Sequence, residues 1–263
     1  MSFYWVYDIP EWALCALMTI TSIAFSAGGV LVTRGQARRL FGQNGMNDIV
    51  SYFLSATGVF YGITLGLIAV GAWQTYTSVT DKASNEAAAL ATICQDVRLL
   101  SDSPTKTKLI EALKKFTRHV IDEDWPLQRK GQIPRGGTDS LESVVKLAVS
   151  LDTQTEIDRI VVAEIYTRLN ILIDLRRLRL ESVTSGLPAP LYWVVIIGGL
   201  INVSITWCFV MEKTSSHVFL SGVIGALIGL LIFMVAAMDN PFRGEYSVGP
   251  GAFQIVFDRY FSN

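Results

Sequence analysis

The chain alternates between long uncharged stretches and polar stretches that carry a helical apolar pattern. The longest uncharged stretch covers residues 49–79, about thirty positions without one charged side chain. About 20 apolar residues suffice to cross the hydrocarbon of a bilayer, so this stretch predicts a helix that crosses the membrane and continues beyond it. Its far end carries Trp73, Gln74 and Tyr76, whose amphipathic side chains suit the headgroup layer.

Three further spans are predicted over residues 12–32, about 191–211 and about 218–238. No Asp, Glu, Lys, Arg or His falls inside any of the four spans. The ionisable group that marks a proton relay or an ion-coupled transporter is therefore missing from them. Asn202 is the most polar interior side chain, and we expect it to make an interhelical hydrogen bond.

Small residues recur at helical spacing on two of the spans. On a helix, such a stripe lets another helix approach closely. The predicted packing positions are Gly58, Gly62 and Gly66 in the second span, and Ser221, Gly225 and Gly229 in the fourth. The stripe beside the first of these sets carries Ser55, Val59 and Ile63, a ridge suited to face a symmetry mate or a pore.

Between the second and third spans lies a polar region of about 110 residues with helical apolar periodicity. Ser103-Pro104 predicts the start of a helix over residues 105–121, and residues 139–150 predict a short helix. A capping box at Thr153 and Glu156 predicts a helix that runs to about Ser182. We expect two membrane helices over residues 1–76, an extramembrane helical domain over 77–187, two membrane helices over 188–239 and a tail over 240–263.

Composition supports an all-α membrane protein with four transmembrane helices and a large helical domain inserted between the second and third. Half of the 263 residues are apolar and the mean hydropathy is +0.39, as expected of several spans diluted by a polar region. A net charge of −1 indicates no general attraction to nucleic acid. Cys15, Cys94 and Cys208 are too scattered for a disulfide framework or a metal site, so we expect buried thiols.

Catalytic and metal-binding patterns are missing. The sequence has no GxSxG, HExxH or CxxC motif and no phosphate-binding glycine loop, so we expect neither an enzyme nor a bound metal or cofactor. The acidic run 122–124 is predicted to be a solvated helix end. Arg176, Arg177 and Arg179 precede the third span, where lipid headgroups or anions in a vestibule are the expected partners.

Two motifs resemble the bestrophin family. The second span ends in FYGITLGLIAVGAWQTY, which is similar to the pore-lining second helix of bestrophins. Directly after the fourth span, the sequence NPFRGE is similar to the bestrophin Asn-Pro-Phe-Gly-Glu motif, which in that family opens the segment that clasps the neighbouring subunit. The matching residues are Asn240, Pro241, Phe242, Gly244 and Glu245. The chain is most similar to the bacterial bestrophin-like group.

The resemblance implies a homopentamer in which the second helix of each subunit lines an ion pore. Matching Trp73 and Tyr76 to the family's Trp and Tyr puts Ser55, Val59 and Ile63 at an apolar neck. A second register, which matches the family's Phe-Tyr pair, makes Phe60 the gate instead. Either neck is apolar, which fits gating by dewetting. The implied partners are inorganic ions, membrane lipid and further copies of the chain.

The sequence departs from the family pattern in the calcium-binding segment, and its charge distribution conflicts with the membrane orientation that the family implies. The residues after Glu245 lack the acidic run that coordinates calcium in animal bestrophins, so calcium activation does not carry over. Three arginines between the first two spans favour a cytoplasmic loop there. The resemblance instead places both termini and the large domain in the cytoplasm of a bacterial inner-membrane protein, and we follow it.

These observations favour an oligomeric ion channel. The alternative is a membrane scaffold or sensor whose spans present the helical domain to a partner. A motor subunit that conducts protons fits less well, because such machines need an ionisable or polar proton site in the membrane.

Overall fold

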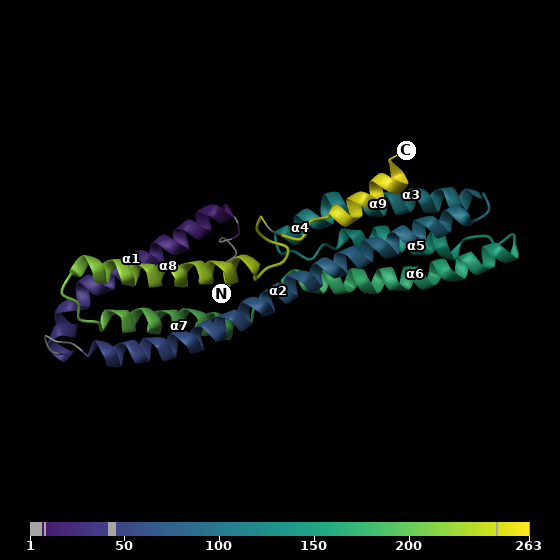
Figure 1. The fold of residues 1–263 in the computed structure, drawn as a ribbon. Helices are drawn as coiled ribbons and strands as arrows, with labels where there is room; N and C mark the ends of the chain where they lie inside the picture. Colours follow the sequence, from purple (N-terminus) through teal and green to yellow (C-terminus); the bar gives the residue numbers. More distant parts are fainter. Residues whose placement is uncertain (1–6, 8, 42–45, 246, 263) are drawn as a thin grey trace. The chain divides into compact units, whose positions relative to one another are not determined.

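The structure is a computed structural model that describes residues 7, 9–41, 46–245 and 247–262, and the secondary structure of these residues is helical (Figure 1). Its α-helices are α1 (Glu11–Phe41), α2 (Asn47–Leu99), α3 (Pro104–His119), α4 (Trp125–Arg129), α5 (Gly136–Val149), α6 (Glu156–Glu181), α7 (Ala189–Trp207), α8 (Thr214–Met238) and α9 (Gly251–Phe261). A π-helical turn over Val120–Asp124 joins α3 to α4. The predicted all-α fold is confirmed.

The chain divides into two compact units. The membrane unit comprises Met1–Gln74 and Gly186–Asp239, and the helical unit comprises Thr75–Ser185 and Asn240–Asn263. Helix α2 is continuous over 53 residues and contributes to both units. Four helical segments, which include α1, α2, α7 and α8, are long and apolar enough to cross a membrane. The tail, which we expected as a segment of its own, belongs to the helical unit.

In the membrane unit, small residues let α8 lie close against α1. A Cβ atom added to Gly225 would lie 2.7 Å from the backbone oxygen of Ser22, and one added to Gly229 would lie 2.8 Å from the Cα atom of Thr19. The hydroxyl groups of Ser26 and Ser221 are 2.7 Å apart across the same contact. The two helices therefore pack backbone to backbone, with little room for larger side chains.

Helix α1 is longer than predicted. The sequence indicated a loop from Thr33 onward, but the helix continues to Phe41. Arg34 and Arg38 lie on its last turns, where they donate hydrogen bonds to backbone carbonyls of Met211 and Glu212 between α7 and α8. Basic residues in the last turn, here Arg38 and Arg39, favour a helix by interacting with its dipole.

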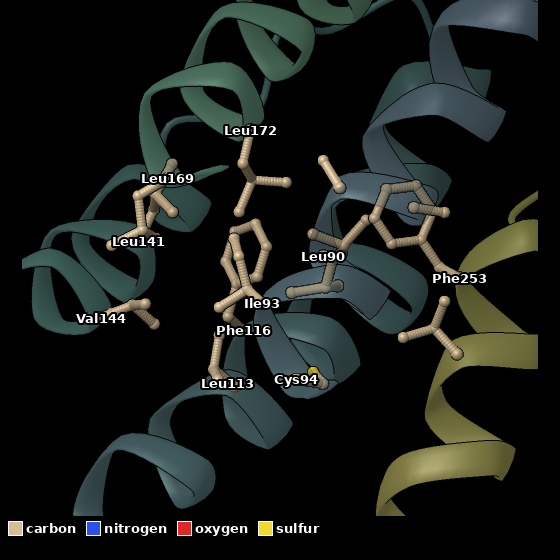
Figure 2. Packing of buried hydrophobic residues seen from close by; sticks show 14 of the residues in the cluster. Leu90, Ile93, Cys94, Leu113, Phe116, Leu141, Val144, Leu169, Leu172 and Phe253 are labelled. Atoms are coloured by element: carbon tan, nitrogen blue, oxygen red, sulfur yellow. The ribbon is translucent and has the colours of Figure 1, made fainter. Parts of the chain in front are cut away.

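The helical unit has a continuous apolar core. Side chains from the second half of α2, from α3, α5 and α6, and from the tail helix α9 meet in it (Figure 2). Leu90, Ile93, Phe116 and Leu172 are wholly buried there. Burial of one such side chain contributes about 1.5–3 kcal/mol relative to exposure, so this unit has the means to fold around its own core.

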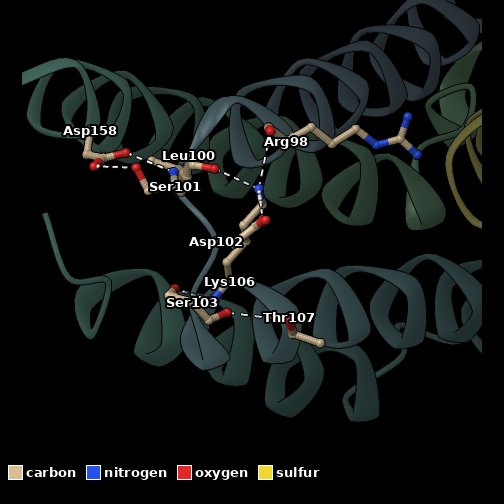
Figure 3. A network of polar contacts seen from close by, with 8 residues as sticks. All are labelled: Arg98, Leu100, Ser101, Asp102, Ser103, Lys106, Thr107 and Asp158. Carbon is tan, nitrogen blue, oxygen red and sulfur yellow. Dashed lines mark hydrogen bonds and ion pairs between the residues drawn. The ribbon is translucent and has the colours of Figure 1, made fainter. Parts of the chain in front are cut away.

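The caps of the helical unit combine one confirmed and one corrected prediction. Ser103 caps α3 as predicted, with its hydroxyl accepting from the Lys106 N–H at 3.1 Å. The predicted capping box at Thr153 is wrong by two residues, because Thr155 and Asp158 form it. Asp158 also accepts hydrogen bonds from the backbone N–H and hydroxyl of Ser101, both at 3.0 Å (Figure 3). This tertiary partner, which the local motif does not reveal, favours the later start.

The three cysteines are free thiols; Cys94 is buried as predicted, whereas Cys15 and Cys208 are only partly buried. Cys94 lies in the core of the helical unit, on the buried side of α2 (Figure 2). Burial raises the pKa of its thiol to about 12, so at neutral pH the group stays protonated and behaves as a small apolar side chain.

Candidate functional site

Helix α2 packs against its own chain on one side. In the membrane unit Leu65, Ile68 and Ala72 are buried. The first two pack with Val195 of α7 and Val235 of α8. These three residues recur at helical spacing, so they define one packed face of α2.

The opposite face of α2 is uncovered in the single chain. At 3.6 residues per turn, Ile63 lies about 180° around the helix from Ala72. Val59, Phe60 and Ile63 are 60%, 74% and 59% exposed. Ser55 is exposed as well. The four predicted neck residues thus lie away from the packed face, with Ile63 directly opposite it and Phe60 about 60° to one side.

The glycines of the second span have unequal surroundings. A Cβ added to Gly58 would lie 3.8 Å from the Asn202 side chain, whereas one added to Gly62 or Gly66 would meet no atom within 4 Å. Close packing at these two positions therefore requires a neighbour from outside the single chain. On α7, Gly198 and Gly199 make room for the ring of Tyr61, whose hydroxyl donates to the Val195 carbonyl at 2.9 Å.

Asn202 makes the expected interhelical hydrogen bond. Its side-chain oxygen accepts from the Thr57 hydroxyl of α2 at 3.2 Å, and its amide donates to the Gly198 carbonyl at 2.9 Å. The buried amide is thereby satisfied at both ends. Together with the Tyr61 hydrogen bond, it holds α7 against the packed side of α2.

The tail motif packs into the helical unit of its own chain. Phe242 is buried with its ring edge-on to Trp125, at 6.0 Å between centroids. The Trp125 indole donates to the Val248 carbonyl at 2.9 Å, and the Val248 N–H donates to the Pro241 carbonyl at 2.8 Å. Gly244 has φ of +84°, a conformation that favours glycine, so the turn accounts for this residue of the motif.

Arg243, which the bestrophin pattern lacks, ties the motif to the loop after α4. Its N–H donates to the Asn240 carbonyl at 3.0 Å, and its guanidinium donates to the Lys130 carbonyl at 2.6 Å. A Cβ on Gly131 would overlap with this guanidinium, so a glycine is needed opposite it. Glu245, the last residue of the motif, is exposed.

The helical unit contains an ion pair that sequence reasoning missed. Arg179 of α6 and Glu86 of α2 are both wholly buried and form two hydrogen bonds, of 2.5 and 3.0 Å. The guanidinium also lies 4.8 Å from the centre of the Trp125 ring. The pair thus joins α2, α6 and the tail-binding Trp125.

A second buried pair overturns two sequence predictions. Asp124 is wholly buried and lies 2.8 Å from Arg176, so the end of the acidic run is not solvated. Arg176 and Arg179 are buried as well, so they are not available to lipid headgroups, while Arg177 is exposed and pairs with Glu181. The π-helical turn before α4 changes the helical phase locally, which sequence periodicity does not reveal.

A signal for the buried arginines was present in the sequence. Buried positions recur along α6 at spacings of three and four residues, and the arginines continue that series. The series is Ile165, Leu169, Leu172, Arg176 and Arg179. In the part of the chain that the structure describes, no group of three or more His, Cys, Asp or Glu side chains is arranged to hold a metal ion.

Comparison with known proteins adds a family and a fold. A family model described as the bestrophin-like domain matches residues 20–253. Crystal structures of a bacterial bestrophin homologue from Klebsiella pneumoniae share the fold. A single-residue variant matches at 11% identity and a TM-score of 0.70, covering 95% of this chain and 99% of its own. A structure phased on zinc matches at 11% identity and a TM-score of 0.69, covering 93% and 99%. None of the curated proteins compared matches the sequence.

Proposed function

The chain belongs to the bestrophin-like family, and from that premise we propose that it is the subunit of an oligomeric ion channel. Copies of α2 line the pore, and Ser55, Val59 and Ile63 form its neck. The subunit number is five, by resemblance to the bestrophins. The assembly lies in a bacterial inner membrane, with both termini and the helical unit in the cytoplasm, and has no catalytic role.

One-sided burial of α2 is the observation that carries this proposal. The face around Leu65, Ile68 and Ala72 meets α7 and α8, while Ile63 points the opposite way and is 59% exposed. A central helix in a ring has one face against its own subunit and one toward the axis. The packing of α2 suits that position, and it favours the register with Ile63 rather than Phe60 at the centre.

The chemistry of the uncovered face suits a gate rather than a charged filter. Ser55, Val59 and Ile63 bear no charge, and a narrow apolar constriction closes by losing its water. The open space at Gly62 and Gly66 would let a neighbouring copy of the chain approach the flank of α2. The tail motif stabilises the helical unit, which also contains the second half of α2.

Replacement of the central neck residue tests the proposal. Ile63→Ala should raise the unitary conductance in planar bilayers by about twofold or more, because a wider apolar constriction stays wet. Ile197→Ala is the matched control, since Ile197 is also half-exposed and apolar but lies on α7. The control should conduct as the wild type does. Equal currents from both variants would contradict the neck assignment.

A scaffold or sensor is the second candidate, and the self-contained core of the helical unit favours it. The two candidates differ in what the full chain does on its own. A scaffold should show no current after reconstitution, whereas the proposed channel should conduct and should appear by imaging as a ring with α2 nearest the axis. A monomer, or a ring lined by another helix, would exclude the channel.

A further inference from the structure

Helix α2 keeps one packed side in the helical unit as well. Val79, Ala83, Leu90 and Val97 are buried there, against the core formed with α3, α6 and α9. These positions repeat at intervals of four and seven residues, which keeps them on one side of a helix. The side of α2 opposite to them is therefore the outward side in this unit.

Asp81 lies at the centre of that outward side. Along the continuous sequence of α2, Asp81 follows Ile63 by eighteen residues, which is a whole number of α-helical turns. Asp81 is exposed, and so is Ala88, seven residues further on. Apart from Asp81, the positions near this line between Trp73 and Thr92 are small or polar and uncharged, and the line ends at the exposed Leu99. They include Gln74, Thr77, Ala88 and Thr92.

The two other charged residues between Asp81 and Leu90 of α2 have partners on α6 or directly after it. Glu86 is buried against Arg179, and the Lys82 ammonium donates to the Ser182 hydroxyl at 2.9 Å. None of the ion pairs between described residues includes Asp81. The outward side of α2 thus carries a carboxylate that no cation among the described residues neutralises by direct pairing.

We propose that Asp81 lines the ion path beyond the neck and gives the channel a preference for cations over anions. The inference rests on the proposed function, because it needs several copies of α2 around one axis. In such a ring every subunit contributes one carboxylate at the same depth. The summed potential raises the local concentration of cations and lowers that of anions, while the apolar neck itself has no charge with which to discriminate.

Removal of the carboxylate at two salt concentrations tests the proposal. In asymmetric KCl, Asp81→Asn should lower the potassium-to-chloride permeability ratio about threefold or more at ~0.01 M, where charges act over about 30 Å. At ~1 M the screening length is about 3 Å, so the variant and the wild type should agree. Asp152→Asn, an exposed carboxylate between α5 and α6, is the matched control and should keep the wild-type ratio.

Ala88 allows the same test without loss of Asp81. Ala88→Lys places a positive charge on the same side two turns further on and should also lower the potassium-to-chloride ratio at low salt. Asp81→Asn combined with Ala88→Asp moves the carboxylate along the helix and should restore the ratio. Both positions are exposed, so the variants should elute as assemblies of wild-type size.

The outcomes separate this proposal from the channel itself. If Ile63→Ala changes the conductance but neither Asp81→Asn nor Ala88→Lys changes the permeability ratio at low salt, the role of Asp81 is refuted and the pore remains. An equal fall of the ratio in the Asp152 control also refutes it, since the effect then reflects net charge alone. If the reconstituted wild-type chain carries no current, both proposals fail.

Discussion

The helical unit and the membrane unit stabilise their helices by different means. In the helical unit a continuous apolar core unites α2, α3, α5, α6 and α9. In the membrane unit, Leu65, Ile68, Val195 and Val235 form a smaller buried cluster, and many large apolar side chains elsewhere in this unit are exposed. Lipid tails are as apolar as leucine, so membrane helices gain little by hiding apolar surface from them. An uncovered face there is consistent with contacts to lipid, a pore or another copy.

Buried polar groups show the same contrast. The helical unit buries two pairs of opposite charges, Glu86 with Arg179 and Asp124 with Arg176. It also buries Asp158, whose carboxylate accepts hydrogen bonds from Ser101 and Thr155. Where α1 meets α7 and α8 in the membrane unit, the buried polar groups are short and neutral, with the hydroxyls of Ser26, Ser221 and Thr206 bonded in series. Small hydroxyls permit close backbone contact, whereas long charged side chains need the space that a bundle in water provides. Three predictions follow the contrast, from the largest effect to the smallest.

Breaking the buried ion pair should damage the helical unit most. Glu86→Ala leaves the Arg179 guanidinium buried without its carboxylate, which should cost about 3–5 kcal/mol of unfolding free energy. Chemical denaturation followed by far-UV circular dichroism measures the loss. Glu142→Ala, which removes one partner of the exposed Glu142–Lys146 pair, should leave the unfolding curve unchanged. Equal losses in both variants would contradict the assigned importance of burial.

Two glycine substitutions should separate packing within a chain from packing between chains. Gly225→Leu forces a side chain against the backbone of α1, which should destabilise the membrane unit by about 1–3 kcal/mol or more. Gly62→Leu meets open space in the single chain, so the subunit should stay folded while the assembly fails. Thermal unfolding together with native mass measurement distinguishes the two effects. A Gly62→Leu assembly of normal size and stability would refute the packing role of Gly62.

The smallest expected effect is on the pH dependence of the stability of the helical unit. Hydrogen bonds from the Ser101 backbone, the Thr155 hydroxyl and the Ser101 hydroxyl lower the pKa of Asp158 to about 2. An unperturbed aspartate has a pKa of about 3.9, so its stabilising contribution is complete above about pH 4 and is lost as the pH falls toward 2. Asp158→Asn should destabilise the unit at pH 7 and flatten its pH dependence in this window. An unaltered slope in the variant would contradict the assigned pKa.

Local and tertiary features differed in how far the sequence revealed them. The second helix and the NPFRGE motif were recognisable because each is a contiguous stretch with a distinctive pattern. The partners of that motif were not, since Trp125 and Val248 reach it through tertiary contacts. Arg176 and Arg179 were misassigned because their charge was weighed above their spacing, although that spacing continued the buried series of α6.

The sequence by itself determined the number of spans, their approximate limits and the helical character of the rest, because span length and apolar periodicity are local properties. It left open which side of α2 faces outward, since a helix that is apolar all round has no preferred side until other helices cover part of it. Only the tertiary structure decided that question, by burying Leu65, Ile68 and Leu90 and leaving Ile63 and Asp81 uncovered. It likewise decided which charges lie inside, because a buried charge requires a partner that is distant in the sequence.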